Sequence, residues 1–235
     1  MKRNTDYKND ALAALKGNWG KAVLATVIYM AIVYIAMGPY MYQNFKFQAA
    51  MTAAGGAMDA EALISQMSTV TGYLGLYSLL TIFLIAPLMV GFINAFRALL
   101  VQGDREIPTN MYKIATKGYW HKVWGMFLMS VFIFLWSLLF VIPGIIKAFS
   151  YAMTPYILEE HPELTANEAI DHSRAMMKGH KFDLFWLYLS FIGWGILCIP
   201  TLGIGTFWLI PYMQTAQASF YEDVKADYEV NGGQV

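Results

Sequence analysis

Long uncharged runs alternate with short charged stretches along the chain. Four stretches without a lysine, arginine, aspartate or glutamate dominate the pattern. They cover 22–45, 63–96, 123–146 and 184–221. A helix that crosses the hydrocarbon core of a bilayer needs about 20 predominantly apolar residues. Each run therefore has room for one or two crossings, and the pattern predicts an all-α, polytopic membrane protein.

Turn signals divide the runs into six predicted transmembrane helices, paired in three hairpins. The first two helices cover 22–41 and 73–99, with a polar connection rich in glycine and alanine between them. Pro143-Gly144 interrupts the second hairpin, which ends near residue 158, and the sequence "IPTLGIG" at 199–205 interrupts the third.

The chain is predicted to be a single membrane domain made of these hairpin units. The units cover 9–103, 104–160 and 161–223, followed by a cytoplasmic tail at 224–235. The last two hairpins are short, with about 17 residues in each arm of the third, close to the lower limit for spanning. Full spans are the favoured interpretation, and re-entrant hairpins are the alternative.

Basic residues set the predicted orientation. Fourteen of the 16 lysines and arginines fall before the first helix, around the connection between the second and third helices, before the fifth helix or in the tail. The other two are Lys46 and Lys147. Because cytoplasmic loops carry the excess of basic residues, both termini are predicted to be cytoplasmic.

Composition agrees with a membrane protein and excludes some functions. Charged residues make up 14% of the chain and hydrophobic residues 57%, whereas a soluble domain has about 25% charged residues. The formal net charge is zero, which argues against a nucleic-acid partner because binding a duplex requires a basic face. Cys198 is the single cysteine, so the chain has no internal disulfide.

A Lys-Gly motif opens each hairpin, as "KGNW" at Lys16, "KGYW" at Lys117 and "KGHKF" at Lys178. We predict a short interfacial amphipathic helix before each motif, at 9–16, 109–117 and 166–178, the last with a Thr165–Glu168 capping box. Gly118 and Gly179 are the predicted elbows, with a left-handed cap at Gly179. Three such units predict pseudo-threefold symmetry, either around a central cavity or in a solid bundle.

The second half of the chain carries a family resemblance. The segments "MTPYILEEHPELTANEAIDHSRAMMKGHKFDLFWLYLSFIGWGIL" and "GIGTFWLIPYMQTAQASFYED" resemble a bacterial membrane-protein family catalogued as domain of unknown function 975, over residues 117–223. The framework is more distantly similar to the membrane domain of some glycerophosphodiester phosphodiesterases, but the chain carries no catalytic domain of that kind. The resemblance implies a six-helix membrane protein of a bacterium and brings no catalytic residues.

Candidate catalytic and metal-binding groups are few. "DHSR" at Asp171–Arg174 contains the residue types of a hydrolase triad, but consecutive helical residues point about 100° apart and cannot form the relay. The acidic pair Glu159-Glu160 is interpreted as a helix-end charge in preference to a cation site. We therefore expect no catalytic residue, no metal site and no cofactor.

Polar residues inside the apolar runs are the more informative positions. Pro87, Pro155 and Pro211 should each free the carbonyl four residues earlier. The predicted helices also carry three amides that either line a polar pocket or hydrogen-bond between helices: Asn94, Gln214 and Gln217.

Lys147 is a charged residue in an otherwise apolar segment, so its position requires a physical explanation. It follows Pro143 by about one helical turn, so its stem can reach the outer interface. It is either an interface anchor or a cation that faces a central cavity and contacts an anionic headgroup or substrate.

The sequence leaves three classes of function. We favour a non-enzymatic accessory, scaffold or lipid-handling protein of the bacterial cytoplasmic membrane. A small transporter or channel with a polar cavity is the alternative, and a membrane-embedded enzyme is the third. Expected partners are membrane lipids and other membrane proteins or a second copy of the chain, without nucleic acid.

The orientation is testable with topology reporters. Because of the bias in lysine and arginine, reporters fused after Asp104 and at Val235 should report the cytoplasm, and a reporter at Gly55 should report the outer side. A cytoplasmic signal from the Gly55 fusion would overturn the threading.

Overall fold

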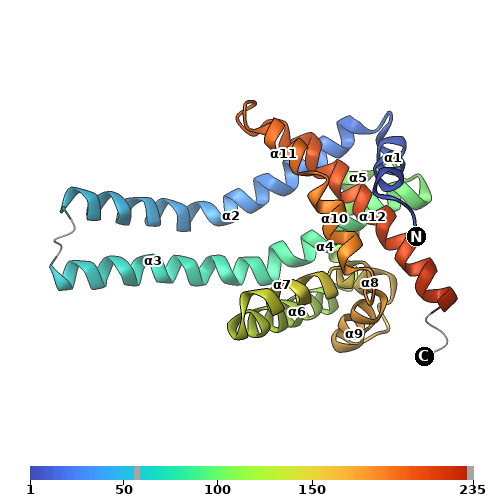
Figure 1. The fold of residues 1–235 in the computed structure, drawn as a ribbon. Helices are drawn as coiled ribbons and strands as arrows, with labels where there is room; N and C mark the ends of the chain where they lie inside the picture. Colours follow the sequence, from blue (N-terminus) through green and yellow to red (C-terminus); the bar gives the residue numbers. More distant parts are fainter. Residues whose placement is uncertain (56–58, 232–235) are drawn as a thin grey trace.

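The computed structural model describes residues 1–55 and 59–231, and the part of the chain that it describes is all-helical (Figure 1). The last four residues of the predicted tail lie outside the described residues. The helices are α1 Asn4–Leu15, α2 Trp19–Ala53, α3 Ala60–Leu80, the π-helix Thr81–Ile85, α4 Ala86–Gln102, α5 Ile107–Thr116, α6 Tyr119–Leu139, α7 Val141–Ser150, α8 Thr154–Glu160, α9 Ala166–Met176, α10 Lys181–Leu189, α11 Ile192–Cys198 and α12 Thr206–Asn231.

Three short helices, α1, α5 and α9, lie near the positions expected for interfacial helices. Each is followed by a Lys-Gly pair whose glycine has positive φ: 80° at Gly17, 61° at Gly118 and 94° at Gly179. L-residues with a side chain rarely adopt this conformation. The glycines therefore let the chain turn sharply into α2, α6 and α10. Thr165 and Glu168 form the reciprocal capping box at the start of α9.

The first hairpin is a long arm. In Figure 1, α2 and α3 run side by side away from the rest of the molecule. The 35 residues of α2 correspond to about 52 Å at 1.5 Å per residue. The predicted helices at 22–41 and 73–99 were too short, because Gln, Lys, Met and Ala beyond Met41 favour helix and continue α2 to Ala53.

The other two hairpins are shorter and have apolar ends. The second turns at Phe140, which is extended (φ −161°), rather than at Pro143-Gly144 as predicted. Pro143 instead lies in the first turn of α7, where its missing N–H costs no intrahelical hydrogen bond. Phe140 is 74% exposed at the end of this hairpin, and Leu202 is 93% exposed at the end of the third.

Five helical segments in the described residues are long and apolar enough to cross a membrane: Trp19–Ala53, Ala60–Gln102, Tyr119–Leu139, Val141–Glu160 and Lys181–Cys198. The prediction of six transmembrane helices is therefore not confirmed. The expected sixth, α12, carries Gln214, Gln217, Glu222 and Asp223, which lower its hydropathy. It packs against α1, α2 and α4, so much of its surface contacts protein.

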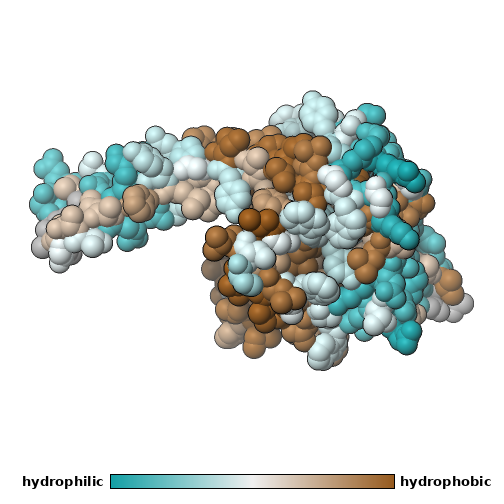
Figure 2. Space-filling view, turned by 90° about the horizontal axis from the view of Figure 1, so that it is seen from above, coloured by the Kyte–Doolittle hydropathy of each residue, from teal (hydrophilic) through white to brown (hydrophobic). Residues whose placement is uncertain are grey.

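The body of the molecule has a polar end and an apolar middle. Figure 2 shows hydrophilic residues gathered at the end of the body opposite the arm, hydrophobic residues across its middle, and hydrophilic residues again at the far end of the arm. The N-terminus and the C-terminal end of α12 lie on the side of the body opposite the arm (Figure 1). This distribution is the one expected of a protein whose middle contacts lipid.

One close approach fixes α4 against α5. A Cβ added at Gly91 would lie 2.1 Å from the Met111 carbonyl oxygen and 2.9 Å from the Ala115 Cβ. Only glycine fits there, so the two helices pack with their backbones almost in contact.

The elbows give a stability prediction. Gly179→Ala should lower the free energy of unfolding by about 1 kcal/mol, because it places a Cβ in left-handed backbone. Nothing lies within 4 Å of that Cβ position, so the loss would come from the backbone alone.

The matched control is Gly20→Ala, whose Cβ also meets nothing within 4 Å but which lies in the first turn of α2. This variant should be neutral or slightly stabilising. Thermal unfolding in detergent would measure both, and equal melting temperatures for the two variants would contradict the elbow.

Candidate functional site

A cluster of charged side chains joins α4, α8 and α12. Arg97 in α4 donates to Glu160 at the end of α8 at 3.0 Å, and also to Glu222 in α12. Lys225 and the Tyr221 hydroxyl in α12 donate to the same Glu160 carboxylate. The Arg97 and Glu160 side chains are 15% and 19% exposed, so these ion pairs are largely removed from water.

A second buried charge lies beside the cluster. The side chain of Lys122, in the first turn of α6, is 2% exposed. Its ammonium donates to the carbonyl oxygens of Ile114 and Lys117 and pairs with the Glu159 carboxylate. Three oxygen acceptors therefore satisfy the three N–H donors of this ammonium. Glu159 and Glu160, expected as helix-end charges, both form ion pairs.

Asn94 lies one turn before Arg97 and links α4 to α8. Its Nδ2 donates to the carbonyl oxygens of Val90 at 3.0 Å and Pro155 at 2.9 Å. Its Oδ1 is buried and has no hydrogen-bond partner in the described part of the chain. Asn94, Arg97, Asp104, Glu159 and Glu160 contribute to the lining of a pocket of about 400 Å³.

The two glutamines that the sequence placed with Asn94, either in a polar pocket or in hydrogen bonds between helices, lie elsewhere. Gln214 and Gln217 are half-buried residues of α12, and neither lines the Asn94 pocket. The Oε1 atom of Gln214 is buried without a hydrogen-bond partner among the described residues. The structure thus separates the three amides that the sequence grouped together.

Lys147 lies in α7 and contacts the aromatic rings of its own hairpin. Its Nζ is 4.4 Å from the centre of the Trp136 ring and 5.9 Å from that of Tyr151. A cation over an aromatic face is stabilised by the ring quadrupole. Lys147 is not part of the Asn94 pocket.

The three prolines occupy different backbone environments. Pro87 follows the π-helix Thr81–Ile85, and the Phe83 carbonyl accepts a hydrogen bond from the Tyr119 hydroxyl. Pro155 lies in the first turn of α8, and Pro211 lies inside α12. The Pro155 and Pro211 carbonyls accept side-chain hydrogen bonds from Asn94 and from Thr215, respectively.

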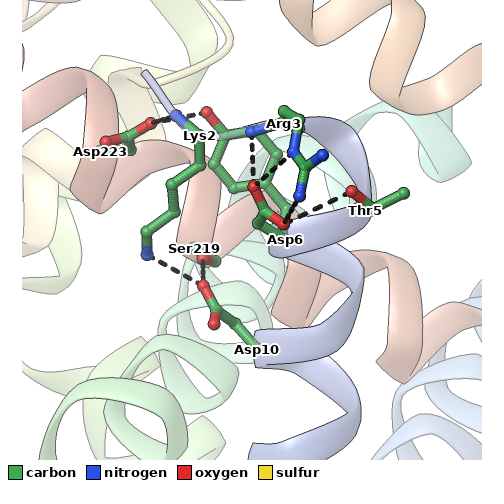
Figure 3. A network of polar contacts seen from close by, with 8 residues as sticks. Lys2, Arg3, Thr5, Asp6, Asp10, Ser219 and Asp223 are labelled. Carbon is green, nitrogen blue, oxygen red and sulfur yellow. Dashed lines mark hydrogen bonds and ion pairs between the residues drawn. The ribbon is translucent and has the colours of Figure 1, made fainter.

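The N-terminal segment is tied to α12 by a separate polar network (Figure 3). The Lys2 backbone N–H and the Tyr7 hydroxyl each donate to Asp223 at 2.7 Å. Ser219 and the Lys2 ammonium donate to Asp10 at 2.7 and 2.9 Å. Burial opposes ionisation of both aspartates, but these hydrogen bonds outweigh it and lower the pKa of Asp10 and of Asp223.

The "DHSR" residues contact different neighbours. Ser173 is buried; it donates to the Ser150 carbonyl at 3.0 Å and accepts from the Met153 N–H at 3.2 Å. Asp171 pairs with Arg174 at 3.1 Å. Burial is the largest influence on His172 and lowers the pKa of its imidazole. These contacts position α9 and do not form a catalytic relay.

Metal ligands do not gather in the described residues. Within 1–55 and 59–231, no group of three or more His, Cys, Asp or Glu side chains could hold a metal ion.

Sequence reasoning missed most of the charge cluster. Arg97 and Lys225 contributed only to the predicted orientation, and Glu222 contributed to no prediction. Each looks like a charge at the boundary of its own apolar segment. The available signal was Arg97, which ends an otherwise uncharged run of more than 30 residues.

The fold and the apolar helices define an all-helical protein with features of a membrane protein. Residues 138–228 match a family described as "Protein of unknown function (DUF975)". This match extends from the end of α6 through most of α12, and it supports the resemblance found in the sequence. The similarity to glycerophosphodiester phosphodiesterase membrane domains is not confirmed.

No curated protein matches the chain. No solved structure matches it either.

The charge cluster predicts a large and specific loss of stability. Arg97→Gln should lower the free energy of unfolding by about 3–5 kcal/mol, because it leaves Glu160 and Glu222 with a missing partner in a poorly solvated site. Arg97→Gln combined with Glu160→Gln should cost less than the sum of the single changes. Denaturation in detergent would measure these values.

Arg3→Gln provides the control. Arg3 forms an ion pair with Asp6, but its side chain is 85% exposed, so the change should have no measurable effect. Strict additivity of the two Gln substitutions would show that Arg97 and Glu160 do not interact.

Proposed function

We propose that this protein is a non-enzymatic accessory or scaffold protein of the bacterial cytoplasmic membrane that also contacts lipid through its short hairpins. Both termini and the three elbows would lie at the cytoplasmic face. The observation that carries the proposal is the length and polarity of the α2–α3 arm.

The arm is longer than a bilayer requires. A hydrocarbon core of about 30 Å takes about 20 helical residues. If α2 enters the membrane near Ala22, residues beyond about 42 would extend roughly 16 Å past the core. This outer part contains Gln43, Lys46 and Gln48 on α2, and Glu61 and Gln66 on α3, a composition suited to water.

The outer part of the arm also exposes large apolar side chains. Phe45 is 72% exposed, Ile64 67% and Met67 52%. Apolar groups on a polar, projecting element are typical of a surface that contacts another protein. They support a partner outside the membrane, either another membrane protein or a second copy of this chain.

The short hairpins support the contact with lipid. Their ends, at Phe140 and Leu202, are apolar and exposed, and the 138–146 and 199–205 segments carry no charge. Such ends are stable in hydrocarbon or at its boundary and unfavourable in water. This interpretation holds whether the hairpins span the bilayer fully or re-enter the same face.

Photo-crosslinking in intact cells tests the proposal. A photoreactive residue at Phe45 should give one defined protein adduct, because this part of the arm would lie outside the bilayer beside a partner. The same residue at Ile35, which is 76% exposed on the same helix, should give lipid adducts. Mass spectrometry of the adducts would identify both.

Two outcomes would contradict the proposal. Lipid adducts at both positions would place the whole arm in the membrane. A diffuse set of protein adducts at Phe45, varying from one preparation to another, would mean that no partner occupies this surface.

A small transporter is the second candidate function. The buried Oδ1 of Asn94 and Oε1 of Gln214, both without partners among the described residues, favour it, because intramembrane polar atoms often line a transport path. Solute flux through reconstituted liposomes that is abolished by Asn94→Leu would support this function over a scaffold.

A further inference from the structure

An apolar groove lies between α1, the start of α2 and the third hairpin. It has a volume of about 390 Å³, and four aromatic side chains contribute to its lining: Trp19, Trp194, Trp208 and Tyr212. Trp194 and Trp208 are 52% and 48% exposed. Because these walls are half-exposed, the groove is open to whatever surrounds the third hairpin.

The groove extends from a charged helix to an apolar turn. At one end, Leu12 belongs to α1, which contains three charged residues. At the other end, Cys198 and Gly205 flank the turn of the third hairpin. That turn carries no charge, and its Leu202 is 93% exposed. The groove therefore has the polarity of a lipid, with a polar end and a long apolar part.

Lys8 lies at the polar end of the groove. It precedes Leu12 by four residues, so the two side chains lie on the same side of α1. Its Nζ is 4.6 Å from the centre of the Phe191 ring. The Phe191 ring in turn contacts the Tyr212 ring, with 5.1 Å between their centres. One aromatic ring thus separates this cation from the apolar lining.

The Lys8 ammonium forms no ion pair with the described residues. It donates to the Ser190 carbonyl oxygen at 2.9 Å, which uses one of its three N–H donors. By contrast, Lys2 and Arg3 each pair with an aspartate of α1. Burial lowers the pKa of the Lys8 ammonium, and an anion beside it would favour the charged form.

We propose that this groove binds one anionic phospholipid, with an acyl chain against Trp194 and Trp208 and the phosphate near Lys8. An apolar chain alone would fill the groove but leave Lys8 without an anion, and a small anion would leave the apolar walls uncovered. A lipid such as phosphatidylglycerol meets both requirements. This proposal rests on the lipid contact of the short hairpins proposed above, and it does not depend on the outer arm or its partner.

Native mass spectrometry after release from nanodiscs tests the headgroup. From discs with equal amounts of phosphatidylglycerol and phosphatidylcholine, the protein should retain phosphatidylglycerol about fivefold more often, as expected for one basic residue beside an anionic headgroup. Lys8→Gln should remove most of this preference, and Lys8→Arg should keep it. The matched control is Lys117→Gln, which removes an exposed lysine outside the groove and should also keep it.

Tryptophan quenching tests the position of the acyl chain. The fluorescence of Trp208, taken as the difference between wild type and Trp208→Phe, should be quenched more by phosphatidylglycerol with brominated chains than by brominated phosphatidylcholine. The control is Trp124, which is 58% exposed on α6 and does not line the groove. Its fluorescence, obtained in the same way from Trp124→Phe, should be quenched equally by the two lipids. This comparison needs no Lys8 variant, so it also decides the case in which Lys8→Gln fails to fold.

The outcomes separate this proposal from the general lipid contact. Equal quenching of Trp208 by the two lipids would overturn the anionic lipid and leave the lipid contact of the hairpin intact. Quenching of Trp208 by neither lipid would overturn both. A preference that Lys8→Gln leaves unchanged, or a dimer retained in place of lipid, would overturn the assignment of this groove to an anionic phospholipid.

Discussion

The charge network around Arg97 is the constraint on which the arrangement of the helices depends. In a bilayer, apolar faces gain little by leaving lipid for one another, so helix association requires close packing and polar contacts. Arg97 and Glu160 bring together α4, α8 and α12, which come from all three predicted hairpin units. Lys122 adds the start of α6 through Glu159. The helices are therefore joined at one end by ion pairs.

Close backbone contacts operate in the same region. Gly91 allows α4 to approach α5, and a Cβ at Gly125 in α6 would lie 2.6 Å from the Leu158 side chain of α8. Small residues and ion pairs thus both act on α4, α6 and α8. Removal of Arg97 would leave Glu222 without its ion pair and Glu160 with only Lys225 and Tyr221 as partners in a poorly solvated site, whereas the distant parts of the hairpins would keep their local packing.

Local signals accounted for the parts of the fold that depend on neighbouring residues. The Lys-Gly motifs located the positive-φ turns at Gly118 and Gly179, and the Thr165–Glu168 spacing located the start of α9. The apolar runs located the long apolar helices but not their ends, because no helix breaker follows Met41 until Gly55. The prediction of α12 as a sixth membrane span is not confirmed, because its polar residues lower its hydropathy and the sequence could not show that Gln214 and Glu222 are partly buried against other helices.

The candidate site was harder to predict from the sequence, because its contacts also depend on the tertiary arrangement. Asn94 stood out as an amide in an apolar run, but its partner is the Pro155 carbonyl, 61 residues away. Lys147 stood out in the same way, and its neighbours are Trp136 and Tyr151 in its own hairpin. An isolated polar residue therefore indicates that a partner exists. Only the tertiary arrangement distinguishes a structural contact from a pocket.

The architecture also connects the pocket to the outer arm through a single stretch of helix. Asn94 and Arg97 lie in α4, which is continuous with α3 across the π-helix Thr81–Ile85. A π-helical turn is a local irregularity often found where a helix bends or carries function. Here the Tyr119 hydroxyl from the second elbow binds the Phe83 carbonyl inside that turn. This contact holds the point where the arm leaves the body against the start of α6. The start of α6 also carries Lys122, which forms an ion pair with Glu159, so the direction of α3 is linked to the charged residues through α6.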